Sequence, residues 1–274
     1  MTQRVRYDSS RYCDTYEGAD VPSASEWRDM IAVAMSNRLD PVDAHVYRCI
    51  QFSSHSSPLV MGCRDGRDYV VKGLRRPDLA RALVNDHVMG ILGREMHAPV
   101  PAVSLVNIPA ALDQRSAGAQ ALPAGVAHGS HYMPDASKVR EGIKNFDIAI
   151  NRPRFAILAI MYGWAGVQSD HQFFYQDGTN AVYSFDHGHF FPNGPNWTPS
   201  GLKSAPAAVP DPVITKKCGL RGVGLDAAKE NLRLISDATI ARAVGAPPDQ
   251  WLISMEYRVA LAMYLDARRL NLLS

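Results

Sequence analysis

The chain has 274 residues, of which 46% are hydrophobic and 20% charged, so it is long enough to bury one large core or two lobes. Its formal net charge is +2, from 29 basic and 27 acidic residues, which argues against a dedicated nucleic-acid binder. The four cysteines form no C-x-x-C pair and the N-terminus shows no signal-peptide pattern, so we expect a cytoplasmic protein with free thiols. No apolar stretch is long enough to span a bilayer, and we expect no membrane partner.

Residues 1–40 are expected to be an N-terminal extension with one helix. The sequence Ser23-Ala24-Ser25-Glu26 is typical of a helix start, because the serine hydroxyl and the glutamate carboxylate can cap each other's backbone amides. It leads into the apolar stretch 27–35.

Residues 41–125 are expected to form a small antiparallel sheet with one helix. Strands are predicted over 44–52, 59–63, 68–73 and 102–108. The Asp65-Gly66 dipeptide between the second and third strands is a strong hairpin signal. Apolar residues that recur every three or four positions over 78–96 predict the helix.

Residues 126–274 are expected to be mainly helical. Helices are predicted over 140–150, 153–167, 226–244 and 248–271. A hairpin is expected over 173–185, turning at Asp177-Gly178. Residues 110–137 are rich in Ala, Gly, Ser and Pro, which indicates a mobile connection, and the prolines of 192–215 indicate an extended loop.

Lys72 ends an apolar strand, and a buried lysine is costly unless it is paired or holds a charged ligand. We therefore interpret Lys72 as a clamp for nucleotide phosphates, although a strand-end lysine that points to solvent would look the same in the sequence. The partner acid would be Asp86 on the next helix, with Glu95 as the reserve.

The loop before this lysine strand offers a second phosphate-binding element. It contains Ser53, Ser54, His55, Ser56 and Ser57. Hydroxyl groups and backbone amides in such a turn can hold phosphate oxygens, so we predict that this loop covers the nucleotide. It lacks the Gly-x-Gly-x-x-Gly pattern of ordinary kinases, and serine-rich turns are common in proteins without such a role.

Asp170 and Asp186 flank the predicted hairpin, each at the end of an apolar segment. Mg²⁺ bound with ATP needs hard oxygen ligands and few protein groups. Two carboxylates at the ends of one hairpin meet that need, Asp186 for the metal and Asp170 to orient an acceptor hydroxyl. A lysine strand followed by two such aspartates is the order in which a protein-kinase-like phosphotransferase carries its catalytic groups.

The same residues allow a rival interpretation as a metal-dependent hydrolase. The possible ligands are Asp170, His171, Asp186, His187 and His189. No His-x-x-x-His or His-Glu-x-x-His pair stands on a predicted helix, so we favour the kinase interpretation.

Over roughly residues 45–270 the chain resembles the HipA-like family of atypical serine/threonine-type kinases. The matching segments are Asp65–Lys72, Leu83–His87, Pro99-Val100-Pro101, His128-Gly129-Ser130, Asp170-His171, Asp186–Phe190 and Ala246 to Arg269. The resemblance implies an α+β, two-lobed protein-kinase-like fold with a small antiparallel-sheet N-lobe and a mainly helical C-lobe. It also implies an enzyme that uses ATP and Mg²⁺ to phosphorylate a hydroxyl acceptor.

The resemblance assigns a role to each candidate residue. Lys72 would contact the phosphates, Asp86 would pair with it, and Ser53–Ser57 would cover the nucleotide. Asp170 would act as the catalytic aspartate and Asp186 would bind magnesium. The acceptor, a protein or a small molecule, and the oligomeric state are not specified by these motifs.

One position departs from the family pattern. Relatives usually place a metal-binding asparagine about five residues after the catalytic aspartate, where this chain has Tyr175. Gln172 is the nearest amide and is the expected substitute, in the catalytic group and as a metal ligand. The departure leaves open a pseudokinase, a protein that binds nucleotide with little or no transferase activity.

Overall fold

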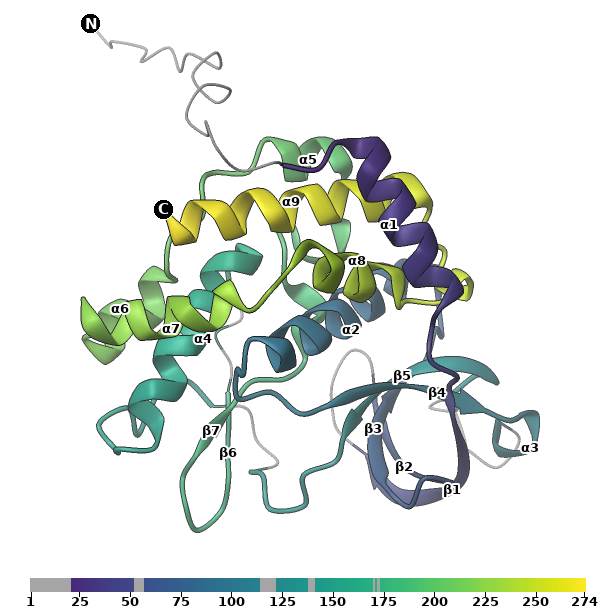
Figure 1. Ribbon diagram of the computed structural model, residues 1–274. Helices are drawn as coiled ribbons and strands as arrows, with labels where there is room; N and C mark the ends of the chain where they lie inside the picture. The colour runs from purple at the N-terminus through teal and green to yellow at the C-terminus, as the bar shows by residue number, and fades with distance from the viewer. Residues whose placement is uncertain (1–20, 52–56, 114–121, 138–140, 170, 172) are drawn as a thin grey trace, which may run out of the picture.

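The structure is a computed structural model that describes residues 21–51, 57–113, 122–137, 141–169, 171 and 173–274. A small barrel forms one half of the molecule and a stack of helices forms the other (Figure 1). Helix α2 (Ala80–Glu95) lies between the two halves and contacts both β5 (Gly125–His131) of the barrel and helix α8 (Asp237–Gly245). Almost every side of α2 is therefore buried, and it has no polar face.

The predicted antiparallel sheet is in fact a closed barrel. Its strands are β1 (Val42–Gln51), β2 (Leu59–Cys63), β3 (Asp68–Lys72), β4 (Val103–Ile108) and β5 (Gly125–His131), in the order β1-β2-β3-β5-β4. Four of the pairings in the described barrel are antiparallel, but β1 pairs with β4 in parallel, with Val42 opposite Val106. Closure buries an apolar interior that includes Tyr69, Val71 and Ala127 and pairs the strand edges with each other.

The expectation of a mobile connection over 110–137 is wrong for its described part. This part contains helix α3 (Ala110–Asp113) and β5, which pairs with β3 on one side and β4 on the other. Its small residues allow close packing: a Cβ on Gly129 would lie 2.5 Å from the side chain of Val106 on the neighbouring strand β4. The barrel thus continues past residue 126, where we expect the helical lobe to begin.

Three further expectations about the second half need correction. The helix expected over 140–150 is absent from its described residues, because the Glu141 backbone pairs with Phe173 and Asn145 has a positive φ of 52°. The expected extended loop at 192–215 contains the starts of helices α5 (Pro199–Lys203) and α6 (Pro212–Cys218). Both prolines occupy the first helical turn, where the missing N–H costs nothing.

The expected helix over 226–244 is two helices, α7 (Val223–Arg233) and α8 (Asp237–Gly245), because Ser236 caps the second one. Helix α4 (Asn151–Ala165) confirms the helix expected over 153–167, and β6 (Phe174–Tyr175) with β7 (Val182–Tyr183) confirms the hairpin. The helix expected over 248–271 is helix α9 (Met255–Leu273), which begins later because residues 249–251 form a separate 3₁₀ turn. None of the described helices is long and apolar enough to cross a membrane.

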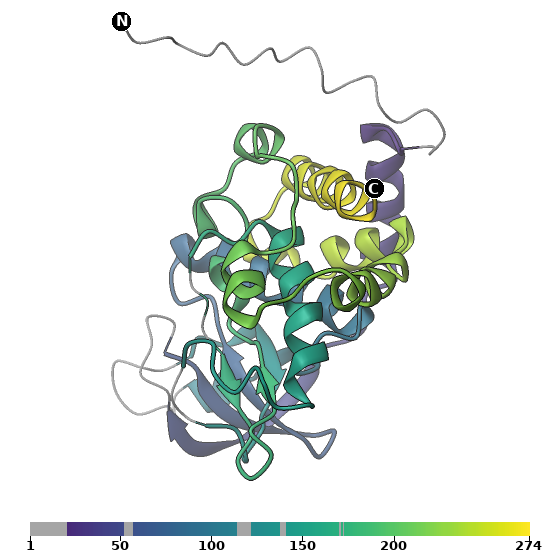
Figure 2. The same ribbon diagram turned by 90° about the vertical axis from the view of Figure 1, so that its left-hand side faces the viewer.

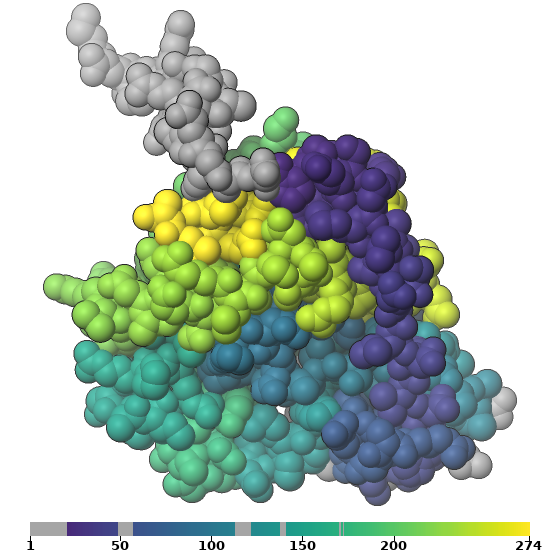
Figure 3. Space-filling model, viewed as in Figure 1, coloured from purple at the N-terminus to yellow at the C-terminus, as the bar shows by residue number. Residues whose placement is uncertain are grey.

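Helix α1 (Ala24–Ser36) begins with the predicted capping box at Ser23 and Glu26. It packs against α8 and α9 (Figures 1 and 2). Its Trp27 and Ile31 are fully buried. The space-filling view shows α1 lying directly on the C-terminal helices (Figure 3). The described part of the expected extension is therefore built into the helical half.

Candidate active site

Lys72 lies on the outer face of the barrel. Side chains alternate along a strand, so Tyr69 and Val71 point into the barrel while Val70 and Lys72 share the opposite face. Only 8% of Lys72 is exposed, so its ammonium group needs partners that replace water.

Two carboxylates provide those partners. Lys72 Nζ lies 2.6 Å from Asp86 Oδ2 and also forms an ion pair with Asp186 Oδ1. The lysine thus joins β3, α2 and the short 3₁₀ turn η4 (His187–His189), which follows Asp186. The structure brings together three residues that the sequence analysis places in one site. Glu95, the reserve partner, pairs instead with Arg242 at 2.9 Å.

Asp86 connects the lysine to the backbone next to Asp186. While its Oδ2 contacts Lys72, its Oδ1 accepts a hydrogen bond of 2.5 Å from the backbone N–H of His187. Asp186 has a left-handed backbone, with φ 69° and ψ 55°, a conformation that aspartate tolerates better than most residues. The Asp186 side chain is 19% exposed against 4% for Asp86, so Asp186 is the carboxylate that a cation can reach from solvent.

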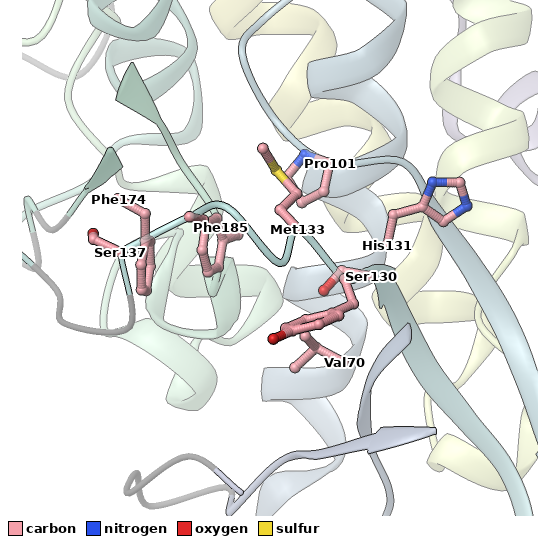
Figure 4. Close-up of a pocket in the computed structure, with 10 residues that line it drawn as sticks. Val70, Pro101, Ser130, His131, Met133, Ser137, Phe174 and Phe185 are labelled. Carbon is pink, nitrogen blue, oxygen red and sulfur yellow. The ribbon is translucent and has the colours of Figure 1, made fainter. Parts of the chain in front are cut away.

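An apolar cleft lies between the barrel and the hairpin (Figure 4). It is lined by Val70, Pro101, Ser130, His131, Tyr132, Met133, Ala136, Ser137, Phe174 and Phe185. The rings of Phe174 and Phe185 stack with centroids 3.5 Å apart. Val70 is two residues from Lys72 on the same strand face, and Phe185 directly precedes Asp186, so the cleft borders the segments that carry these charged residues.

This cleft is not predicted by any motif in the sequence. Its walls come from β3, β5, the hairpin and the segment 131–137, and no local pattern links these segments in the sequence. The available signals were the shared face of Val70 and Lys72 and the position of Phe185 before Asp186.

Several predicted site residues lie outside the described residues. They are Asp170, Gln172, Ser53, Ser54, His55 and Ser56. Ser57 is described, and its carbonyl accepts a 2.9 Å hydrogen bond from Arg75 Nη2 on the loop after β3. The roles predicted for these residues stay predictions.

Tyr175, which stands where relatives carry a metal-binding asparagine, is buried on β6. Its hydroxyl donates to the Gly142 carbonyl at 2.9 Å and accepts from the Lys144 backbone N–H at 2.9 Å. Burial raises the pKa of the Tyr175 phenol to about 12, so it is neutral at physiological pH. The hydroxyl thus holds the 142–144 segment instead of offering an anionic oxygen to a metal.

The residues of the alternative metal site are engaged separately. His171 Nε2 lies 2.9 Å from Asp211 Oδ2, His187 Nε2 lies 3.1 Å from Ser184 Oγ, and Asp186 pairs with Lys72. Among the residues that the structure describes, no group of three or more His, Cys, Asp or Glu side chains could hold a metal ion.

The architecture is a protein-kinase-like fold. The chain aligns with the crystal structure of the Helicobacter pylori proinflammatory kinase CtkA with a TM-score of 0.57, 10% identity, and coverage of 85% of this chain and 96% of that one. Residues 48–153, which include Lys72 and Asp86, match the family model described as HipA-like kinase. This match confirms the HipA-like resemblance over that stretch; the segments around Asp170 and Asp186 lie beyond it.

Two structures of the Golgi casein kinase also align, one of them with Mn/ADP bound. Their TM-scores are 0.43 and 0.44, each at 10% identity over 92% of this chain and 76% of theirs. No curated protein matches the sequence.

Proposed function

We propose that the protein is an ATP- and Mg²⁺-dependent phosphotransferase of the HipA-like type, which transfers the γ-phosphoryl group of ATP to a hydroxyl on a protein acceptor. The observation that carries the proposal is Lys72, which bridges Asp86 and Asp186 on segments that border an apolar cleft. The kinase-like fold and the HipA-like match over 48–153 support it. A cytoplasmic location remains part of this proposal.

The cleft suits the base of the nucleotide. Val70, Phe174 and Phe185 offer apolar surface to an aromatic ring, and residues 131–133 line the same cleft. A base bound there directs its phosphates toward Lys72, whose ammonium group contributes positive charge in a site with little water.

The donor set also fits magnesium. Asp186 offers a partly exposed carboxylate, and Mg²⁺ usually takes one or two carboxylates with phosphate oxygens and water. When bound, magnesium supplies neutralising charge for the phosphate oxygens. Gln172 is the proposed second ligand, since Tyr175 is bound to backbone groups. Asp170 is proposed to accept a hydrogen bond from the acceptor hydroxyl and so to aim its oxygen at the phosphorus.

ATP binding by calorimetry and thermal shift, with and without Mg²⁺, tests the proposal on the wild type and on Asp186→Ala. We expect binding that magnesium strengthens in the wild type, and loss of that gain in the variant. The matched control is Asp177→Ala, which removes an exposed carboxylate from the turn of the neighbouring hairpin and should behave as the wild type. Absence of ATP binding in all three proteins would refute the proposal.

A pseudokinase is the second candidate, and the engagement of Tyr175 by Gly142 and Lys144 favours it. Radiolabel transfer from ATP onto the protein itself or onto lysate proteins separates the two. ATP binding without any transfer would support the pseudokinase. Elemental analysis tests the remaining hydrolase interpretation, which predicts stoichiometric zinc or iron in the purified protein.

A further inference from the structure

The segment 184–190, which contains Asp186, is held by polar side chains from two helices. We call it the Asp186 segment. Its Asp186 has the left-handed backbone described above, and residues 187–189 form a single 3₁₀ turn closed by the Phe190 N–H on the His187 carbonyl at 2.9 Å. A non-glycine residue in this conformation costs on the order of 1 kcal/mol and persists only where its surroundings enforce it.

The first support comes from α4. The Tyr162 hydroxyl lies 2.8 Å from Ser184 Oγ, and the same Oγ lies 3.1 Å from His187 Nε2. All three side chains are buried. The Tyr162 and His187 rings each pack edge-on against Phe190, with centroids 4.7 and 4.8 Å apart. This chain of contacts fixes the ring of the residue that directly follows Asp186.

The second support comes from α2. Asn85 is fully buried, and its Nδ2 donates to the carbonyls of Gly188 at 2.9 Å and Phe190 at 3.1 Å. Its Oδ1 accepts from Trp197 Nε1 at 2.8 Å. Asn85 thus fixes carbonyl groups within the turn, while its neighbour Asp86 fixes the His187 N–H.

Hydrogen bonds to both sides of a turn control the orientation of its peptide planes, which apolar packing alone does not. The side chain of Asp186 takes its direction from those planes. If the turn relaxed out of the left-handed conformation, the carboxylate would leave Lys72.

We propose that Tyr162, Ser184 and Asn85 are positioning residues that hold the Asp186 carboxylate in its metal-binding orientation. This inference rests on the proposed function. It separates two properties of the site: the affinity for nucleotide alone comes from the cleft and Lys72, while the gain in affinity with magnesium depends on the polar supports of the Asp186 segment.

The test uses Tyr162→Phe and Ser184→Ala, which remove one or both hydrogen bonds of the α4 support. Calorimetry with ATP, with and without Mg²⁺, should show a magnesium-dependent gain in affinity that is roughly 10-fold smaller than in the wild type, the scale at which groups supporting metal ligands act. Affinity without metal should stay within about twofold of the wild-type value. Ser184→Thr retains a hydroxyl and should restore most of the gain.

Tyr264→Phe is the matched control. Tyr264 is a buried tyrosine whose hydroxyl donates to the Ala165 carbonyl at 3.0 Å, at the end of the same helix α4 but away from the Asp186 segment. Loss of that bond should leave the magnesium-dependent gain unchanged. Amide hydrogen exchange without nucleotide should be faster over 187–190 in Tyr162→Phe and unchanged there in Tyr264→Phe.

Failure of the proposed function and failure of this inference give different results. If wild-type protein binds ATP with no increase in affinity from magnesium, the proposed function and this inference are both wrong. If the wild type shows the gain and Tyr162→Phe, Ser184→Ala and Tyr264→Phe all keep it, the proposed function stands and the positioning role is overturned.

Discussion

His87 on α2 and His128 on β5 face each other with their Nδ1 atoms 3.2 Å apart. A hydrogen bond between two Nδ1 atoms needs one that carries a proton and one that carries a lone pair, so at least the accepting ring is neutral. Burial lowers the pKa of His87 to about 3, helped by His128. Burial, together with Lys72 and His187, lowers the pKa of His128 well below its usual value. The pair joins the helix that carries Asp86 to the barrel.

This pair predicts a loss of stability in mild acid. In the unfolded chain both histidines have pKa values near 6.5, whereas in the folded protein they stay neutral to a much lower pH. Between the folded and unfolded pKa values the unfolded state binds more protons than the folded state. The contribution of the two histidines to the free energy of unfolding is therefore complete above pH 6.5 and falls as the pH drops toward 3. Each histidine contributes a slope of at most about 1.4 kcal/mol per pH unit to the free energy of unfolding.

Urea unfolding at pH 7.5, 6.5 and 5.5 measures this slope. His128→Met removes one of the two groups, so its free energy of unfolding should depend less on pH than that of the wild type. His189 is exposed, and His189→Asn should keep the wild-type slope. Parallel pH dependence in the wild type and His128→Met would contradict the assignment.

Asp170 should matter for turnover and little for binding. If it orients the acceptor hydroxyl, Asp170→Ala should lower the phosphoryl-transfer rate roughly 10²- to 10⁴-fold and leave ATP affinity near the wild-type value. Single-turnover transfer and calorimetry measure the two quantities. Turnover at the wild-type rate would show that another residue orients the acceptor.

The cleft predicts where the base binds. Val70→Phe places a larger ring where Val70 faces the cleft, so the affinity for ATP should fall roughly 10-fold or more, on the scale of other apolar size changes in binding pockets. Val33→Phe makes the same change on the exposed face of α1, where 62% of the valine is accessible, and should leave affinity unchanged. Equal ATP dissociation constants for Val70→Phe and the wild type would place the base elsewhere.

Two glycines predict opposite changes in stability. A Cβ on Gly163 in α4 would lie 2.0 Å from the Val209 carbonyl oxygen, so Gly163→Ala should destabilise the protein by at least about 1–3 kcal/mol. Gly224 in α7 has no atom within 4 Å of the same position, so Gly224→Ala should stabilise by about 0.5–1 kcal/mol. Chemical unfolding measures both, and a neutral Gly163→Ala would contradict the close helix–loop approach.

The charged part of the site could be predicted because its order along the chain carries the information. Lys72 ends a strand, Asp86 lies on the next helix and Asp186 follows the hairpin, so each position can be read from a local pattern. The cleft could not be predicted, since Val70, Phe174 and Phe185 become neighbours only after folding.

The errors in the fold have a similar cause. Prolines occur both in loops and at helix starts. Within 192–215 the capping residues Thr198 and Asp211 are what identify the prolines that follow them as helix starts. A run of small residues in a sequence is compatible with a mobile loop or with close packing. The tight surroundings of Gly129 show that β5 uses its small residues for close packing. The parallel pairing of β1 with β4 depends on contacts between distant segments, which a single sequence does not reveal.

The packing of α1 on α8 and α9 also sets an order of events during synthesis. The barrel strands, β1 to β5, lie within residues 42–131 and can pair soon after they leave the ribosome. Helix α1 is synthesised before them, yet Trp27 and Ile31 can be buried only after residues 237–273, which form α8 and α9, have been synthesised. The apolar side of α1 that carries these two residues therefore stays exposed to solvent until the C-terminal helices have been made.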